Sequence, residues 1–88
     1  MDASELNNGI KTFIIESLLD GDGADLDDHT PLLELGIIDS LAMVSLLRFI
    51  EKKLGVSVPE DEVSPRNFMS IQTLESMILR VHEAQREG

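Results

Sequence analysis

The 88-residue sequence contains no cysteine, tryptophan or tyrosine, and only three phenylalanines. Without cysteine the chain can form neither disulfides nor a thiolate metal site, so its fold depends on a hydrophobic core alone. Apolar residues make up 42% of the chain and include thirteen leucines. A core rich in leucine and poor in aromatic side chains favours packed helices over a sheet. We therefore predict a single all-α domain over residues 1–88.

Basic residues are also scarce: seven Lys and Arg against 17 Asp and Glu give a net charge of −10. Nucleic acids and anionic membranes are bound by basic faces, so the composition argues against both as partners. No apolar run approaches the roughly 20 residues that span a bilayer, and the first residues do not resemble a signal peptide. We expect a cytoplasmic, monomeric protein.

The charge is unevenly distributed along the chain. Residues 1–39 contain ten acids and one base, whereas residues 40–58 contain one acid and three bases. Residues 59–88 contain six acids and three bases. The middle segment is therefore net basic within an acidic chain, which bears on how a partner would recognise it.

Hydrophobic periodicity predicts three main helices. Apolar residues recur at helical spacing over residues 6–18, 43–54 and 71–81. Gly21 and Gly23 end the first helix near Asp20, and a long connection follows to Ile38. Such long loops in compact domains are usually functional or disordered, and buried leucines favour the functional interpretation. The leucines expected to pin one turn of this loop are Leu32, Leu33 and Leu35.

Cap residues mark where these helices start and stop. Asp2 begins the first helix, Asp39 the second and Ser70 the last, since each has a side-chain oxygen that accepts from the first-turn amides. Gly55 ends the second helix. Ser64 followed by proline predicts a short additional helix through Phe68. Glu60 to Val63 is expected to form a single turn.

The acidic first loop does not match a calcium site. An EF-hand loop needs glycine at its sixth position, but that position is Asp25 when the loop starts at Asp20 and Thr30 when it starts at Asp25. A solvated acidic loop is the better interpretation, and we predict no metal site.

Ser40 has little support as a catalytic nucleophile. Gly36 to Ser40 is not the G-x-S-x-G turn of hydrolases, and a nucleophilic serine needs a base within hydrogen-bond reach. The two histidines, His29 and His82, lie in the acidic loop and near the C-terminus. We predict that the chain is not an enzyme.

Asp39 and Ser40 leave two interpretations open. They form either a helix cap and nothing more, or a rigid helix start that presents a hydroxyl for modification by another enzyme. Leu41, Val44 and Arg48 fall at least partly outside the core face of the helix and would flank that hydroxyl. A phosphoester on Ser40 would be tolerated at the positive end of the helix.

The segment from Pro31 to Leu41, P-L-L-E-L-G-I-I-D-S-L, resembles the acyl and peptidyl carrier proteins. The similarity continues through G-V-S-V-P at Gly55 and the residues before the last helix, and so covers nearly the whole chain. It implies a four-helix bundle with three main helices, a short third helix and a long first loop. It also implies that Ser40 carries 4′-phosphopantetheine, attached by a phosphopantetheinyl transferase, with Asp39 fixing the site.

Two differences from the fatty-acid carriers indicate which members of the family the chain resembles. Two residues, Ile37 and Ile38, separate glycine from Asp-Ser, where fatty-acid carriers usually have one; the longer form is similar to stand-alone prolyl/pyrrolyl and D-alanyl carriers. The second helix is net basic rather than acidic, so we expect partners to make apolar contact with it. The residues expected in that contact are Ile38, Leu41, Val44 and Arg48.

The resemblance implies a stand-alone peptidyl carrier in nonribosomal peptide or antibiotic biosynthesis. An adenylation enzyme would load an amino acid on it, with proline on its way to a pyrrole as the narrowest hypothesis, and tailoring or condensing enzymes would follow. The alternatives within the class are a D-alanyl carrier and a polyketide or fatty acyl carrier. Outside it, a helical adaptor domain remains open.

Overall fold

The computed structural model describes residues 2–19, 21 and 26–87 and is helical throughout its regular structure. Three α-helices are present: α1 (Ala3–Phe13), α2 (Ser40–Leu54) and α3 (Ile71–Glu87). A π-helix, Ile14–Leu18, continues α1, and a short 3-10 helix spans Glu60–Glu62. No strand occurs within the described ranges, so the all-α prediction is confirmed.

The first helix begins as the sequence predicts. The Ser4 amide donates to the Asp2 side chain at 2.8 Å, which satisfies one amide of the first turn. Leu6 and Ile10 lie fully buried along its inner face. The last turn is wider than an α-helix, because the Leu19 amide reaches back five residues to the Ile14 carbonyl at 3.0 Å. The predicted stop at Gly21 is confirmed, since this glycine has φ of +88° and its amide donates to the Ile15 carbonyl at 2.7 Å, whereas Asp20 and Gly23 lie outside the described residues.

The caps of the other two helices are also confirmed. The Ala42 amide donates to the Asp39 carboxylate at 2.8 Å, and Gly55 closes α2 with φ of +69°, a left-handed conformation that glycine adopts without strain. At α3, Ser70 and Thr73 cap each other reciprocally, with each backbone amide donating to the other's hydroxyl, at 3.0 and 3.3 Å.

A turn within the long first loop is held against the core by Leu32. Its side chain is fully buried, and its amide donates to the Met69 carbonyl at 2.8 Å, just before α3. The amides of Ile37 and Ile38 both donate to the Leu32 carbonyl, at 2.9 and 3.2 Å. The predicted pinning of this loop is therefore confirmed for Leu32, whereas Leu35 lies exposed, because its side chain points out of the same turn.

The short third helix differs from the prediction. Residues 64–68 form a single turn, closed by the Phe68 amide on the Ser64 carbonyl, and the helical piece is the 3-10 turn before it. A longer helix does not form because other partners take the groups it would use. The Asn67 carbonyl accepts from the Thr73 hydroxyl at 3.1 Å, and the Asn67 side chain donates to the Glu62 carbonyl at 2.7 Å.

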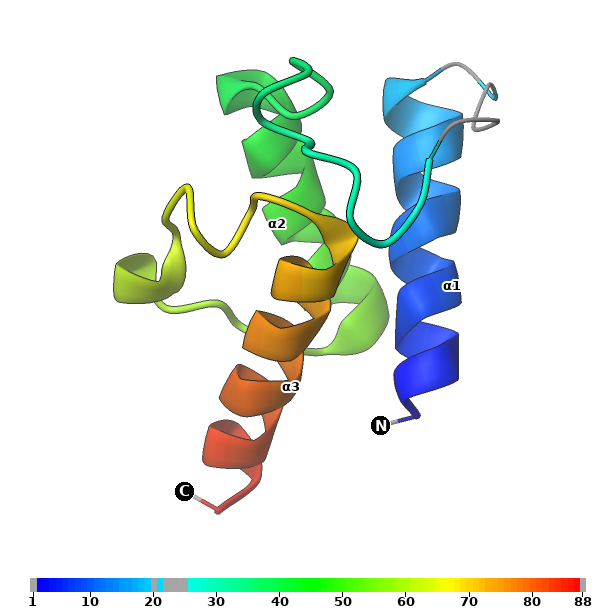
Figure 1. The fold of residues 1–88 in the computed structure, drawn as a ribbon. Helices are drawn as coiled ribbons and strands as arrows, with labels where there is room; N and C mark the ends of the chain where they lie inside the picture. The colour runs from blue at the N-terminus through cyan, green and yellow to red at the C-terminus, as the bar shows by residue number, and fades with distance from the viewer. Residues whose placement is uncertain (1, 20, 22–25, 88) are drawn as a thin grey trace.

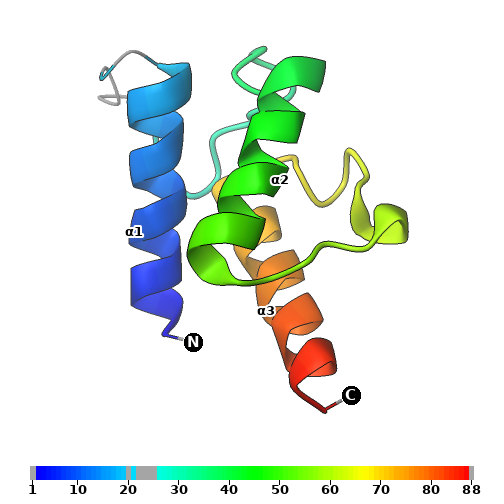
Figure 2. The same cartoon turned by 180° about the vertical axis from the view of Figure 1, so that it is seen from behind.

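The three helices place the start of α2 at one end of the molecule. Both termini lie at the opposite end, as Figure 1 shows, and the view from behind in Figure 2 shows α1 and α2 side by side with α3 passing behind α2. The long first loop passes over the end where α2 begins (Figure 1). Ser40 therefore lies away from the chain ends, next to the loop.

Candidate attachment site

The first turn of α2 is fixed by Asp39. The backbone of this residue is extended. Its carboxylate accepts a hydrogen bond from the Ala42 amide and its carbonyl accepts one from the Met43 amide, both at 2.8 Å. Ser40 follows as the first helical residue and is exposed. The cap thus sets the direction of the helix start, and the positive end of the helix favours a phosphate at Ser40.

The chain enters this site through a tight turn. Gly36 has φ of +74°, in the left-handed region that favours glycine, and the two isoleucine amides after it close on Leu32. This turn brings the chain from the buried Leu32 to the exposed Ser40 in eight residues. Both isoleucines between Gly36 and Asp39 take part in this turn, because their amides bond to one carbonyl.

Ile38 is a correction to the predicted contact residues. Its side chain is only 2% exposed and belongs to the hydrophobic core. It therefore supports the helix start from beneath and is not available as a surface contact in this structure. Ile37 is partly buried against the same core.

Four large apolar side chains remain exposed among the described residues. Leu41 and Val44 are 81% and 50% exposed, as expected from their place on the outer side of α2. Leu35 and Met69 are 61% and 51% exposed. They lie on the two segments that the hydrogen bond from the Leu32 amide to the Met69 carbonyl joins, and sequence patterns did not single them out as surface residues.

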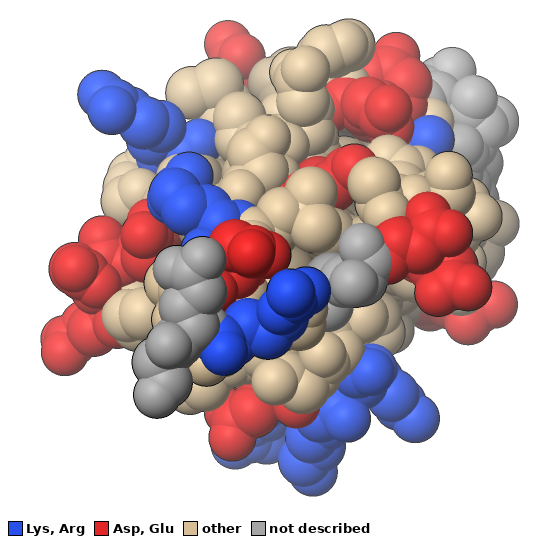
Figure 3. Space-filling model, turned by 90° about the horizontal axis from the view of Figure 1, so that it is seen from below, with Lys and Arg blue, Asp and Glu red and all other residues tan. Residues whose placement is uncertain are grey.

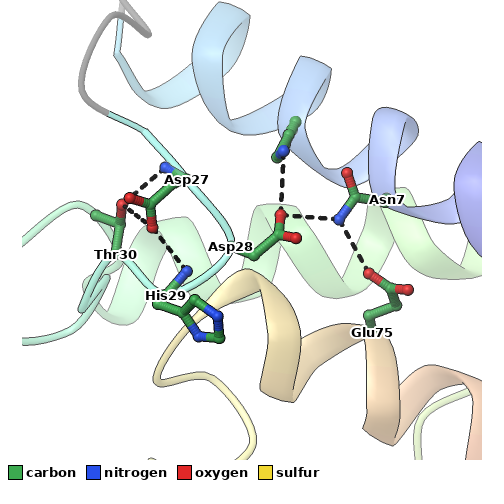
Figure 4. A network of polar contacts seen from close by, with 7 residues as sticks. Asn7, Asp27, Asp28, His29, Thr30 and Glu75 are labelled. Atoms are coloured by element: carbon green, nitrogen blue, oxygen red, sulfur yellow. Dashed lines mark hydrogen bonds and ion pairs between the residues drawn. The ribbon is translucent and has the colours of Figure 1, made fainter.

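A second polar region lies along α1 and the early part of the loop (Figure 4). The Asn7 side-chain amide donates to Asp28 and to Glu75, both at 3.0 Å, and Lys11 forms an ion pair with Asp28 at 3.0 Å. The Gln72 amide donates to the Asp28 carbonyl at 3.0 Å. We call these residues the Asp28 network; it joins the loop to α1 and α3.

Two carboxyl groups among the described residues have a lowered pKa. The hydrogen bond from Asn7, followed by that from Lys11, lowers the pKa of Asp28 below its ordinary value. The hydrogen bond from Arg80, at 2.6 Å, likewise lowers the pKa of Glu62. Both groups are therefore more acidic than usual, which suits ion pairing rather than general acid or base chemistry.

Neither a metal cluster nor a membrane span is found in the described part of the chain. No group of three or more His, Asp and Glu side chains gathers there as a metal would need. No helix in these ranges is long and apolar enough to cross a bilayer. The candidate functional feature is therefore the exposed serine at the start of α2, which apolar side chains flank.

A family model described as "Phosphopantetheine attachment site" matches residues 12–81. The chain belongs to this phosphopantetheine-binding carrier family. The match includes the turn at Gly36, the whole of α2 and most of α3, so it covers Asp39, Ser40 and the apolar side chains beside them. The cofactor of the carrier is therefore 4′-phosphopantetheine, and the carrier is not itself an enzyme.

Curated relatives agree with this assignment. The carrier is 35% identical to "Probable acyl carrier protein PigG" from Serratia sp. (strain ATCC 39006), over 97% of this chain and 93% of the relative. It is 34% identical to "Aminoacyl carrier protein 1" from Bradyrhizobium diazoefficiens, over 64% of this chain and 61% of the relative. Acyl and aminoacyl carriers both occur among its relatives.

A solved structure is more similar still in sequence. The carrier is 49% identical to a chain in a structure described as "Crystal structure of FAD-dependent dehydrogenase", with a TM-score of 0.74. The alignment covers 78% of the carrier and 97% of that chain, so the similar chain is shorter than the carrier.

Proposed function

We propose that Ser40 is the residue that carries phosphopantetheine. The exposed hydroxyl, the cap at Asp39 and the positive helix end support this assignment. In the transfer, the Ser40 hydroxyl oxygen bonds to the phosphorus of the pantetheine phosphate in coenzyme A. The hydroxyl loses its proton, and adenosine 3′,5′-bisphosphate leaves. A phosphopantetheinyl transferase supplies the catalytic groups, so the chain needs only an accessible, firmly held serine.

The bound arm supplies a thiol, which holds an acyl group as a thioester. The chain has no cysteine, so this sulfur is the one available for a thioester on the carrier. We propose that the group is an aminoacyl group from a separate adenylating enzyme. The aminoacyl carriers among the relatives support this cargo, as does the two-residue spacing between Gly36 and Asp39.

Proline on its way to a pyrrole is the narrowest form of the proposal. Conversion of a pyrrolidine ring into a pyrrole removes four hydrogens, which corresponds to two successive two-electron dehydrogenations. FAD accepts two electrons at a time, so an FAD-dependent dehydrogenase can perform this chemistry. The similar chain in a dehydrogenase crystal supports this kind of partner for the carrier. The pathway would be the biosynthesis of a peptide-derived natural product, such as an antibiotic.

An acyl cargo is the second candidate, because the relative matched over most of the chain is called an acyl carrier. It would make the protein a polyketide or fatty acyl carrier. A D-alanyl carrier is a further alternative with the same attachment chemistry. These candidates differ in the acid that is loaded and share the modified serine.

The attachment is tested by mass. Wild-type protein, incubated with coenzyme A and a broad-specificity phosphopantetheinyl transferase, should gain one phosphopantetheine. Ser40→Ala should gain nothing, whereas Ser76→Ala, at an exposed serine on α3, should react as the wild type does. An unchanged wild-type mass with several transferases would contradict the attachment.

The cargo is tested in a second step on the phosphopantetheinylated protein. The cognate adenylating enzyme is offered proline, D-alanine and fatty acids in turn, and the loaded mass is measured. We expect proline to load, and the proline-loaded protein to lose the mass of four hydrogens with an FAD-dependent dehydrogenase. Preferential loading of D-alanine or a fatty acid would select the corresponding alternative.

A further inference from the structure

The peptide group between Met69 and Ser70, at the start of α3, is held on both of its edges. On one edge the Ser70 amide donates to the Thr73 hydroxyl at 3.0 Å. On the other edge the Met69 carbonyl accepts from the Leu32 amide of the first loop at 2.8 Å. This peptide is trans and planar, so its N–H and C=O point to opposite sides and can only turn together. The Thr73 hydroxyl therefore sets the direction of the acceptor that Leu32 uses.

Thr73 is the side chain that holds this segment of backbone. The Met69 side chain is exposed and does not anchor its own carbonyl. The Thr73 hydroxyl oxygen, in contrast, also lies within donating distance of two carbonyls, that of Asn67 at 3.1 Å and that of Ser70 at 2.9 Å. One hydroxyl thus contacts the backbone on both sides of Met69, and the Ser70 side chain beside it is buried.

Leu32 passes this constraint on to the attachment site. Its amide is held by the Met69 carbonyl, and its own carbonyl accepts from the amides of Ile37 and Ile38 at 2.9 and 3.2 Å. Ile38 directly precedes Asp39, the cap of α2. A continuous series of backbone hydrogen bonds therefore joins the start of α3 to the start of α2, with the Thr73 hydroxyl at one end of the series.

We infer that Thr73 is a positioning residue for the transfer of phosphopantetheine to Ser40. This inference rests on the proposed function, which makes Ser40 the acceptor. Thr73 does not act on the serine directly, because its hydroxyl reaches the site only through the Met69–Ser70 peptide and Leu32. Without that hydroxyl the turn before Asp39 would occupy several arrangements, and a transferase that binds one of them would meet a smaller competent fraction of the carrier. The KM for the carrier would then rise while kcat stays the same.

Two substitutions of Thr73 separate the hydroxyl from the shape of the side chain. Thr73→Val removes the hydroxyl and keeps the branched shape, and Thr73→Ser keeps the hydroxyl. In Thr73→Val, amide hydrogen exchange followed by NMR should become about three- to tenfold faster at Leu32, Ile37 and Ile38, which corresponds to one lost hydrogen bond. In phosphopantetheine transfer, KM for the carrier should rise about threefold or more, with kcat and the KM for coenzyme A unchanged. Thr73→Ser should stay within about twofold of the wild type in both measurements.

The second half of α3 offers a control for lost stability. This half runs towards the end of the molecule that holds both termini, where charged side chains of both signs are spread over the surface (Figure 3). Val81→Ala removes a buried side chain about 12 Å along the helix axis from Thr73, and Val81 takes no side-chain part in the hydrogen bonds described above. Its KM for the carrier should stay within about twofold of the wild type, although its unfolding free energy falls.

Several results would overturn the inference. They are an unchanged KM or unchanged exchange in Thr73→Val, a Thr73→Ser protein as impaired as Thr73→Val, and a rise in KM for Val81→Ala as large as that for Thr73→Val. The wild type provides a test that needs no folded variant: the amides of Ser70, Leu32, Ile37 and Ile38 should open together, with protection factors within about threefold of one another. A spread of more than about tenfold would break the series. Failure of the wild type to accept phosphopantetheine would instead overturn the proposed function, and the exchange measurements would be unaffected by it.

Discussion

The two ends of the long first loop are held in opposite ways. Its early part is tied by polar contacts: Asp28 binds Asn7 and Lys11 of α1, and its carbonyl accepts from the start of α3. Its later part is held by the buried side chains of Leu32 and Ile38. Among its described residues, the polar end has no large apolar side chain exposed, whereas the apolar end leads directly to the exposed Leu35 and Leu41.

The residues that hold the loop in place are therefore different from the exposed residues that a partner could contact. Exposed apolar side chains cost solubility and contribute little to folding, so a group of them on a small protein indicates a surface that another molecule covers. The site for that contact stands on a rigid base, because the residues beneath it are buried. Substitutions beneath the surface should therefore change stability, and substitutions on it should change partner reactions.

The largest expected effect is on the buried side of the loop. Leu32→Ala should lower the free energy of unfolding by about 2–5 kcal/mol, because it removes a fully buried side chain and leaves a cavity. Leu35→Ala, three residues later and exposed, should change it by no more than about 0.5 kcal/mol. Urea unfolding followed by far-UV circular dichroism measures both. Equal losses would show that the turn is held by something other than the Leu32 side chain.

The next largest effect is expected on cargo loading, from substitutions of the exposed apolar side chains of α2. Leu41→Asp or Val44→Asp should reduce kcat/KM for cargo loading about tenfold, equivalent to about 1.4 kcal/mol, because a charge replaces an apolar contact in the interface. Helix content should not change, since both side chains face solvent. Thr12→Asp, an exposed position on α1, is the control for the added charge. Unaltered loading in both α2 variants would place the contact on another face.

A smaller effect on stability is expected from Asp39, the cap between the buried turn of the loop and the exposed start of α2. Asp39→Ala should cost about 1 kcal/mol of unfolding free energy, because the Ala42 amide loses its acceptor. Asp39→Asn should recover most of this loss, since an asparagine oxygen also caps. Asp61→Ala removes the same charge from the 3-10 helix, where no side-chain cap is formed, and should have little effect. Thermal unfolding of the three variants compares them, and equal losses for Asp39→Ala and Asp61→Ala would contradict the capping role.

The structural features that depend on short stretches of sequence, the helices and their caps, could be predicted. The three helices follow from apolar spacing, and the cap residues Asp2, Asp39, Ser70 and Gly55 act where the pattern places them. Ser40 emerges as the first residue of α2 because its neighbour is a strong cap. Each of these depends on contacts within a few residues, which is the range that a sequence pattern reports.

Features that depend on tertiary packing were missed. The burial of Ile38 and the exposure of Leu35 depend on which way one turn faces the core, and leucine and isoleucine spacing in a loop does not determine that. The turn at 64–68 is fixed by Thr73, which bonds to the Asn67 carbonyl from the start of α3. The bond between Asn7 and Asp28 joins residues 21 apart, and no local pattern marks it.

The smallest effect concerns the Asp28 network and appears only in acid. The pKa of Asp28 is lower in the folded state than in the unfolded chain, so its carboxylate stabilises the fold above the unfolded value of about 3.9. That contribution is lost as the pH falls through the lower pKa of the folded state, where Asp28 becomes protonated. Asp28→Asn should therefore flatten the dependence of stability on pH below about 4 and leave the shape of the curve above about pH 6 unchanged.

Asn7→Ala makes this test specific to the network. The hydrogen bond from Asn7 is the largest cause of the lowered pKa, so the pKa of Asp28 should rise towards its ordinary value in this variant, as followed by NMR titration of the carboxyl carbon. The pKa of Glu62, lowered by Arg80 on the other side of α3, should not move. Cargo loading at neutral pH should also match the wild type, since the side chains of the network lie on α1, the early loop and α3 and not on α2. Impaired loading in Asn7→Ala would instead show that the polar anchor and the attachment site are coupled.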